Sequence, residues 1–137
     1  MALHFLTTDI DFKPENPGKI KSWISSVINK ESKLLGTVSF IFSSDEYLLA
    51  LNRKYLEKDY YTDVISFDYS LGDTVSGDIF ISIERVKDNA LEYNVHFNDE
   101  LHRVLLHGIL HLSGYNDTTE IEKKLMKDKE DIYLAQR

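Results

Sequence analysis

The stretch HGILHLSGYND, residues 107–117, places two histidines, two glycines and one aspartate at short intervals. His107 and His111 are four residues apart, so on an α-helix they share one face, one turn apart. Gly114 stands where a glycine commonly ends a helix and reverses the chain, which would return Asp117 to the face of the two histidines. The stretch therefore predicts a helix that ends in a tight turn, with three metal ligands gathered there.

Two imidazole nitrogens and one carboxylate oxygen form an incomplete ligand set. Three protein ligands with an open fourth position are typical of catalytic zinc sites, whereas structural sites are closed. The helix is apolar on all sides, which indicates burial, and a buried histidine needs a partner for its polar nitrogens. The alternative is that His107 and His111 are core histidines and Asp117 a turn residue. The glycine and the carboxylate at fixed distances favour a metal ion held by His107, His111 and Asp117. Two histidines and one carboxylate also occur in non-haem iron oxygenases, although histidines four apart on one helix argue against that class.

The composition narrows the possible classes of protein. With 42% hydrophobic and 12% aromatic residues among 137, the chain can build one core, so we expect a single domain over residues 1–137. The lack of cysteine excludes disulfides, zinc ribbons and thiol chemistry. The net charge of −7 argues against strong electrostatic binding of bare nucleic acid. It leaves room for a metal-centred site that binds phosphate locally.

The apolar runs and the N-terminal stretch indicate where the protein acts. No apolar run approaches the roughly 18 residues that a membrane span needs. The stretch MALHFLTTD lacks the charged start and the long apolar segment of a signal peptide. We therefore expect a cytoplasmic protein without a membrane partner.

Hydrophobic periodicity predicts a mixture of strands and helices. Strands are predicted at 3–7, 37–42, 63–69 and 77–83. Helices are predicted within 14–33, from the capping box at 43–46 to about 55, at 84–94, around the two histidines, and from the capping box at 119–122 to about 134. The helices after residue 84 follow one another without a strand between them. This order predicts an α+β fold, in which about five helices pack on a small mixed sheet of about four strands.

Capping residues mark where the predicted helices begin. Ser43 followed by Glu46, and Thr119 followed by Glu122, are capping boxes. Asn98 is predicted to cap the histidine helix, since acidic residues follow it in the first turn. The buried face of the last helix is predicted to carry Ile121, Leu125 and Ile132.

The spacing of the ligands also bears on the chemistry. The pattern HxxxHxxGxxD parallels the HExxHxxGxxH of metzincin peptidases, but Gly108 stands in place of the glutamate that acts as their general base. Peptide hydrolysis is therefore disfavoured. Phosphodiester cleavage asks less of a base built into the protein, because a metal-activated water or a ribose hydroxyl can attack while the metal stabilises the phosphoryl charge.

Three ordered motifs point to one family. HGILHLSGYND resembles the signature HGxLHLxGYDH of the YbeY family of rRNA-maturation metallo-endoribonucleases. LNRKYLEKDYYTDVISFDYS, residues 51–70, looks like the family motif LNxxYRxxDxPTDVLSFP, and GDIFIS, residues 77–82, resembles the strand that follows it. The resemblance implies a zincin-like α+β fold and a bound zinc ion. It also implies cleavage of single-stranded rRNA precursor in 3′ maturation of 16S rRNA and in ribosome quality control, with the small ribosomal subunit and assembly factors as partners.

The chain departs from the family pattern at two important positions. Asp117 stands where the family usually has a third histidine, and aspartate also binds zinc well. Leu56 stands in place of an arginine that would be the natural phosphate clamp. Candidates to replace that arginine are Arg53, Lys54, Lys58, Arg85 and Arg103.

Other polar residues of the second motif are candidates for catalysis and substrate binding. Asp63 is a candidate general base, or could hold a ligand histidine from behind, although the start of a strand explains it equally well. Otherwise catalysis falls to the metal-bound water. Substrate contacts are assigned to Arg53, Thr62, Ser66 and Arg85.

An alternative function from another class is a ribosome-assembly binding factor whose metal is structural. The acidic charge and the loss of the family arginine at Leu56 both weaken the expected contact with RNA. They therefore favour this alternative more strongly here than in a typical member of the family. Glu100, on the same helical face as His107, is predicted to form a surface ion pair with Arg103 or a neighbouring lysine.

Overall fold

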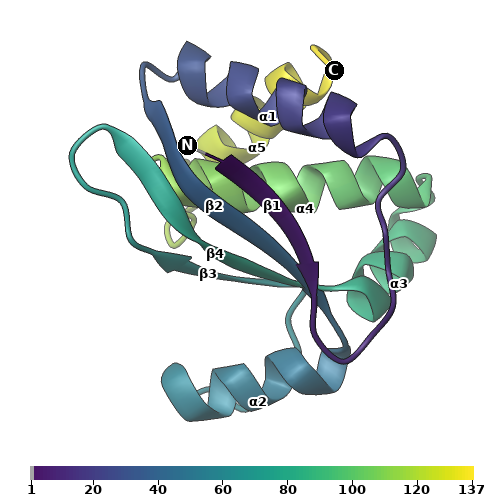
Figure 1. Cartoon of the computed structure of the whole chain (residues 1–137). Helices are drawn as coiled ribbons and strands as arrows, with labels where there is room; N and C mark the ends of the chain where they lie inside the picture. The colour runs from purple at the N-terminus through teal and green to yellow at the C-terminus, as the bar shows by residue number, and fades with distance from the viewer. Residues whose placement is uncertain (1) are drawn as a thin grey trace.

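The computed structural model describes residues 2–137, over which the chain forms five helices and one four-stranded sheet (Figure 1). The elements in chain order are β1 (Ala2–Thr7), α1 (Pro17–Lys30), β2 (Leu34–Ser43), α2 (Asp45–Tyr55), β3 (Val64–Asp68), β4 (Thr74–Ser82), α3 (Ile83–Tyr93), α4 (Phe97–Leu112) and α5 (Glu120–Leu134). The predicted α+β class, with its small mixed sheet and five helices, is confirmed.

The sheet has the strand order β1-β2-β4-β3 and mixes both kinds of pairing. β1 runs parallel to β2, and β2 runs parallel to β4, with Phe40 opposite Ile79. Only β3 is antiparallel to its neighbour β4. The cause is the length of the connections: β3 and β4 are joined by a short turn, whereas parallel strands need a long crossover, here containing α1 or α2.

The core lies between the sheet and the helices α1 and α4, while α2 covers the opposite face of the sheet (Figure 1). α4 is the most buried helix, as its apolar sequence predicted. Its fully buried residues include Leu101, Leu105, Leu106, Ile109 and Leu110. A Cβ atom at Gly108 would lie 2.7 Å from Cγ2 of Ile79. Glycine at this position therefore lets α4 approach β4 closely, one residue away from the first histidine.

Two of the predicted helix starts are wrong. Ser43 is fully buried as the last residue of β2, and Ser44 caps α2 by accepting a hydrogen bond from the Tyr47 backbone N–H. α4 begins after His96, which makes no side-chain capping bond, and Asn98 lies inside the helix. Sequence alone could not tell adjacent serines apart, because the cap is the residue at which the strand ends. The capping box of Thr119 and Glu122 at α5 is confirmed.

The predicted buried face of α5 is also wrong. Ile121, Leu125 and Ile132 are all exposed. The residues of α5 that are buried instead are Met126, Glu130 and Tyr133. Both sets recur at helical spacing, so periodicity could not choose between them. The choice depends on polar contacts of Glu130 with α4, which are described below.

Among residues 2–137, none of the helices is both long and apolar enough to span a bilayer.

Candidate metal centre

The two histidines of α4 and the aspartate of the following loop meet at one point. His107 Nε2 lies 3.1 Å from His111 Nε2. Asp117 Oδ2 lies 3.2 Å from His107 Nε2 and 3.5 Å from His111 Nε2. The three side chains are partly exposed, so their donor atoms are open to solvent on one side. The predicted grouping of His107, His111 and Asp117 is therefore present in the fold.

The spacing of these donor atoms suits a tetrahedral ion. Ligand bonds of about 2.0–2.1 Å at tetrahedral angles put neighbouring donor atoms roughly 3.3 Å apart. The three measured separations, 3.1, 3.2 and 3.5 Å, lie on either side of this length. Two imidazoles and one carboxylate are also ligands that zinc accepts. The residues present therefore fit a zinc ion, with a fourth position left open toward solvent.

The turn after α4 brings Asp117 to the histidines. Gly114 has a φ of +107°, a conformation that favours glycine. The backbone N–H of Tyr115 donates to the Leu110 carbonyl at 3.0 Å and closes the turn. The Tyr115 hydroxyl donates to Oε1 of Glu31, at the end of α1, at 2.5 Å. The loop that carries Asp117 is thus tied down both by its backbone and by a side chain.

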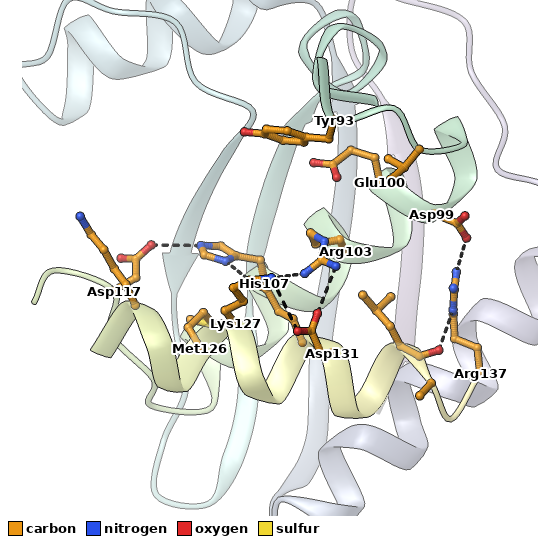
Figure 2. A pocket seen from close by; sticks show the side chains of 15 residues that line it. Tyr93, Asp99, Glu100, Arg103, His107, Asp117, Met126, Lys127, Asp131 and Arg137 are labelled. Atoms are coloured by element: carbon orange, nitrogen blue, oxygen red, sulfur yellow. Dashed lines mark hydrogen bonds and ion pairs between the residues drawn. The ribbon is translucent and has the colours of Figure 1, made fainter. Parts of the chain in front are cut away.

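His107 is held from behind by a buried carboxylate of α5. Its Nδ1 lies 2.7 Å from Oε2 of Glu130, which is only 6% exposed. Because a carboxylate accepts, the hydrogen sits on Nδ1 and Nε2 keeps its lone pair for a metal. Arg103 donates to the other oxygen of Glu130 at 2.9 Å and reaches Asp131 at 3.3 Å (Figure 2).

The sequence did not identify Glu130, which lies in the charged run EIEKKLMKDKED, residues 120–131, as a partner of the site. Local spacing gave no signal that singles out Glu130, because Ile121, Leu125 and Ile132 recur on another face of α5. Met126, Glu130 and Tyr133 share the face that the structure buries. An acidic residue on such a face needs a polar partner inside the protein.

The two histidines differ in their electrostatic surroundings. Burial acts to lower the pKa of His107, but the hydrogen bond and the charge of Glu130, together with the charge of Asp117, outweigh it and raise the pKa. For His111, burial and the charge of His107 lower the pKa, and Asp117 offsets only part of this. His111 is therefore the imidazole that stays neutral to lower pH, while His107 holds a proton more tightly.

Two further carboxyl groups lie behind the metal centre. Asp63, just before β3, accepts a hydrogen bond from the Asn89 side chain at 3.1 Å. Burial raises the pKa of Asp63, although the positive charge of His107 acts to lower it. Glu100 is 4% exposed, and burial likewise raises its pKa, with the charge of Arg103 acting to lower it. The prediction that Glu100 forms a surface ion pair is wrong, because its side chain is buried rather than on the surface.

Cavities reach the metal centre from two sides. One, of about 530 Å³, lies beside α2 and β3 and is called here the α2 cavity. The other, of about 850 Å³, lies between α4 and α5 and is called the α5 cavity (Figure 2). His107 and Asp117 line both. The proposed metal position is therefore at the junction of two hollows rather than at the end of one.

The predicted substrate residues fall into two groups. Thr62 and Ser66 line the α2 cavity together with His107 and His111, and the Ser66 hydroxyl is buried without a hydrogen-bond partner. Arg53 is paired with Asp59 at 2.5 Å on the surface. Arg85 pairs with Asp45 at 2.8 Å, where it joins α3 to the start of α2. Neither arginine is among the residues that line the α2 or the α5 cavity.

The position of the missing family arginine lies at the α2 cavity. Leu56 lines it, and so does Lys58, whose ammonium group lies 5.9 Å from the centre of the Tyr60 ring. Asn52, which is 2% exposed, donates to the Tyr60 carbonyl at 2.9 Å and holds this loop against α2. Of the basic residues suggested by the sequence, Lys58 is the one that borders this cavity, while Arg103 borders the other.

Comparison with known proteins agrees with the geometry. The sequence model of the family described as Endoribonuclease YbeY matches residues 7–137. The chain is 50% identical over 126 residues to Endoribonuclease YbeY of Flavobacterium psychrophilum, covering 92% of this chain and 90% of that protein. It is 43% identical to Endoribonuclease YbeY of Bacteroides thetaiotaomicron over the full length of both.

A solved structure has the same fold. The solution structure of TM1509 from Thermotoga maritima superposes with a TM-score of 0.68 at 28% sequence identity. The superposition covers 97% of this chain and 87% of that one.

Proposed function

The chain belongs to the Endoribonuclease YbeY family, and from this premise we propose that it is a zinc-dependent endoribonuclease specific for single-stranded RNA. Its proposed role is 3′ maturation of 16S rRNA in the small ribosomal subunit and ribosome quality control, in the cytoplasm. The observation that carries the proposal is the set of donor separations of 3.1, 3.2 and 3.5 Å among His107, His111 and Asp117. Residues 1–137 act as one catalytic domain in this proposal.

The protein residues take separate parts in the proposed reaction. His107, His111 and Asp117 hold one zinc ion, and Glu130 keeps His107 in the correct tautomer. When bound, zinc supplies a Lewis acid that lowers the pKa of water and stabilises charge on the phosphoryl group. Asp63 acts as the proton acceptor. Asp63 lines the α2 cavity next to the ligand group, and burial raises its pKa, which suits a proton acceptor.

The α2 cavity is the proposed approach of the substrate. Thr62 and Ser66 offer hydroxyl groups to the sugar–phosphate backbone, and Lys58 offers the positive charge that the family arginine would otherwise bring. The buried Ser66 hydroxyl without a partner supports this assignment, because a substrate oxygen would satisfy it. With a net charge of −7, attraction to RNA must come from local contacts of this kind rather than from the overall field.

The test is cleavage of a labelled single-stranded RNA by zinc-loaded protein. The wild type and His4→Ala should cut it, since His4 is exposed on β1, away from the site. His111→Ala, purified in parallel, should not cut, and duplex RNA of the same sequence should resist. Equal cutting by the His111→Ala protein would assign the activity to a contaminating nuclease and overturn the proposal.

The second candidate function is a ribosome-assembly binding factor whose metal is structural. Leu56 in place of the arginine, together with the acidic charge, favours it. Co-sedimentation with small ribosomal subunits separates the two functions. If the protein is an assembly factor, the wild type and the Asp63→Asn protein should both bind the subunit, and neither should cleave RNA.

A further inference from the structure

An endonuclease must accommodate RNA on both sides of the bond that it cuts. The α2 cavity supplies one side, and the α5 cavity reaches the same two residues, His107 and Asp117, from the other. A third hollow of about 300 Å³, which Asp63 and Tyr93 line, also reaches His107 and Asp117. A single strand can therefore run past the metal centre from one cavity into the other, as in other channels for single-stranded nucleic acid.

Tyr93 is the aromatic residue in the lining of the α5 cavity. It is the last residue of α3 and is 60% exposed, and it lines both the α5 cavity and the small hollow beside Asp63. In Figure 2 its ring lies across the cavity from α5, above His107. A large exposed ring beside a catalytic centre offers a flat surface on which a nucleobase can stack.

The charges of the α5 cavity suit a phosphodiester backbone, although several carboxylates line it. Glu130 and Asp131 are matched by Arg103, and Asp99 is matched by Arg137 at 3.1 Å. The lysines of α5 also have acidic partners: Lys123 Nζ lies 4.0 Å from Glu120, and Lys127 Nζ lies 3.6 Å from Asp131. Two lysines of α5, Lys123 and Lys127, border the cavity with side chains 57% and 69% exposed. A phosphate entering here meets solvated lysines at the rim, while Asp99, Glu130 and Asp131 already face an arginine. Glu100, which also lines the cavity, is only 4% exposed.

We propose that the α5 cavity is a nucleotide-binding subsite in which a base stacks on Tyr93. This nucleotide lies across the scissile phosphodiester from the one in the α2 cavity, and its phosphate lies near Lys123 and Lys127. The subsite presupposes the endoribonuclease activity proposed above. It adds that substrate is held on both sides of the cut, through residues that lie outside the three recognised sequence motifs.

The experiment pairs protein variants with RNA that lacks one base. A short single-stranded RNA is made with an abasic nucleotide at each position in turn around the cut. Cleavage is measured for the wild type, Tyr93→Ala, Tyr93→Phe and Leu91→Ala. Stacking on one aromatic ring changes binding by about 1–3 kcal/mol, so Tyr93→Ala should lower kcat/KM about 5- to 150-fold. Tyr93→Phe keeps the ring, and Leu91→Ala alters an exposed residue of the same helix, so both should match the wild type.

The position of the abasic nucleotide identifies the subsite. The loss of kcat/KM caused by Tyr93→Ala should vanish when the base is missing at one particular position on one side of the cut. At that position the RNA has no base to stack on the ring, so removing the ring has no further effect. Tyr60 lies in the loop 56–62 beside the α2 cavity. The loss of kcat/KM caused by Tyr60→Ala should vanish when the missing base is on the opposite side of the cut. Loss of rate from Tyr93→Ala that persists with every abasic RNA would overturn the subsite, and so would an unchanged rate with intact RNA.

Binding separates the failure of the subsite from the failure of the activity. Fluorescence anisotropy with the same RNAs measures affinity for the zinc-loaded protein whether or not cleavage occurs. A wild type that neither cuts nor binds RNA overturns both proposals. A wild type that cuts and binds, with affinity equal to that of Tyr93→Ala, overturns the subsite alone.

Discussion

The two sides of the metal centre are built in different ways. On the side of α4 and α5, His107 is fixed by the buried Glu130, which Arg103 holds in turn. On the side of α2, the loop from 56 to 62 is mostly exposed, and its tyrosines, Tyr60 and Tyr61, keep about half of their surface in solvent. A buried anchor of this loop is the side chain of Asn52, which donates to the Tyr60 carbonyl.

This difference separates holding the metal from holding the substrate. Metal ligands must keep their geometry before the ion arrives, and buried partners supply that rigidity. Residues that contact a flexible polymer work better on an adaptable, solvated loop. Changes in α4 and α5 should therefore alter metal affinity and stability. Changes in the loop should alter RNA affinity alone.

The largest effect should come from removing a ligand. Asp117→Ala should weaken zinc binding by more than the 10- to 100-fold typical of an outer partner, and RNA cleavage should be lost with it. Competition with a chromogenic chelator measures the zinc affinity. Asp73→Ala removes an exposed carboxylate from the β3–β4 turn and should leave the zinc affinity unchanged. Zinc bound equally well by both variants would remove Asp117 from the ligand set.

Removing the buried carboxylate behind His107 should have the next largest effect. Glu130→Gln should weaken zinc binding by about 10- to 100-fold, because an amide neither fixes the Nδ1 tautomer nor raises the basicity of the ring as a carboxylate does. Asp131→Asn is the matched control, since Asp131 lies on the same helix and also contacts Arg103, but does not touch a ligand. An equal loss in both variants would point to disruption of α5 instead.

The same variant makes a prediction about pH. Zinc competes with protons for the imidazoles, so zinc affinity should fall as pH falls through the raised pKa of His107. Glu130→Gln removes a cause of that raised pKa, and its zinc affinity should therefore begin to fall at lower pH than in the wild type. The gap between the two proteins should narrow toward acid pH. A constant gap across the titration would contradict the role of Glu130.

Close packing of α4 on the sheet gives a stability prediction. Gly108→Ala would place a methyl group 2.7 Å from Ile79 and should lower the free energy of unfolding by about 1–3 kcal/mol. Gly18 lies in the first turn of α1 with open space around it, so Gly18→Ala should raise the free energy of unfolding by up to about 1 kcal/mol. Urea titration of the metal-free proteins measures both. Two changes of the same sign would contradict the packing argument.

The smallest change in stability should come from a substitution in the loop 56–62 beside the α2 cavity. Lys58→Ala should raise KM for RNA several-fold and reduce its salt dependence, because one phosphate contact is lost. The free energy of unfolding should change by less than about 0.5 kcal/mol, as for most surface substitutions. Lys87→Ala, an exposed lysine of α3, should leave KM unchanged. If zinc affinity also fell in the Lys58→Ala protein, the two sides of the site would not be separable as argued above.

Local patterns were enough to predict the grouping of His107, His111 and Asp117 and the fold class. The four-residue spacing of His107 and His111 places them on one face of any helix, and Gly114 ends that helix whatever surrounds it. The mixture and order of strands and helices followed from periodicity. These features depend on residues close together in the sequence, which is why the sequence by itself determined them.

Only the tertiary structure decided which distant residues meet at the site. Glu130 lies 23 positions from His107. It reaches His107 because α5 packs on α4 with one of two equally periodic faces, and the sequence does not rank those faces. The same cause explains the burial of Glu100 and the place of Tyr93 in the α5 cavity. It also explains why Arg53 and Arg85 lie outside both cavities. Each depends on how whole elements pack, which is a property of the complete core and not of any local pattern.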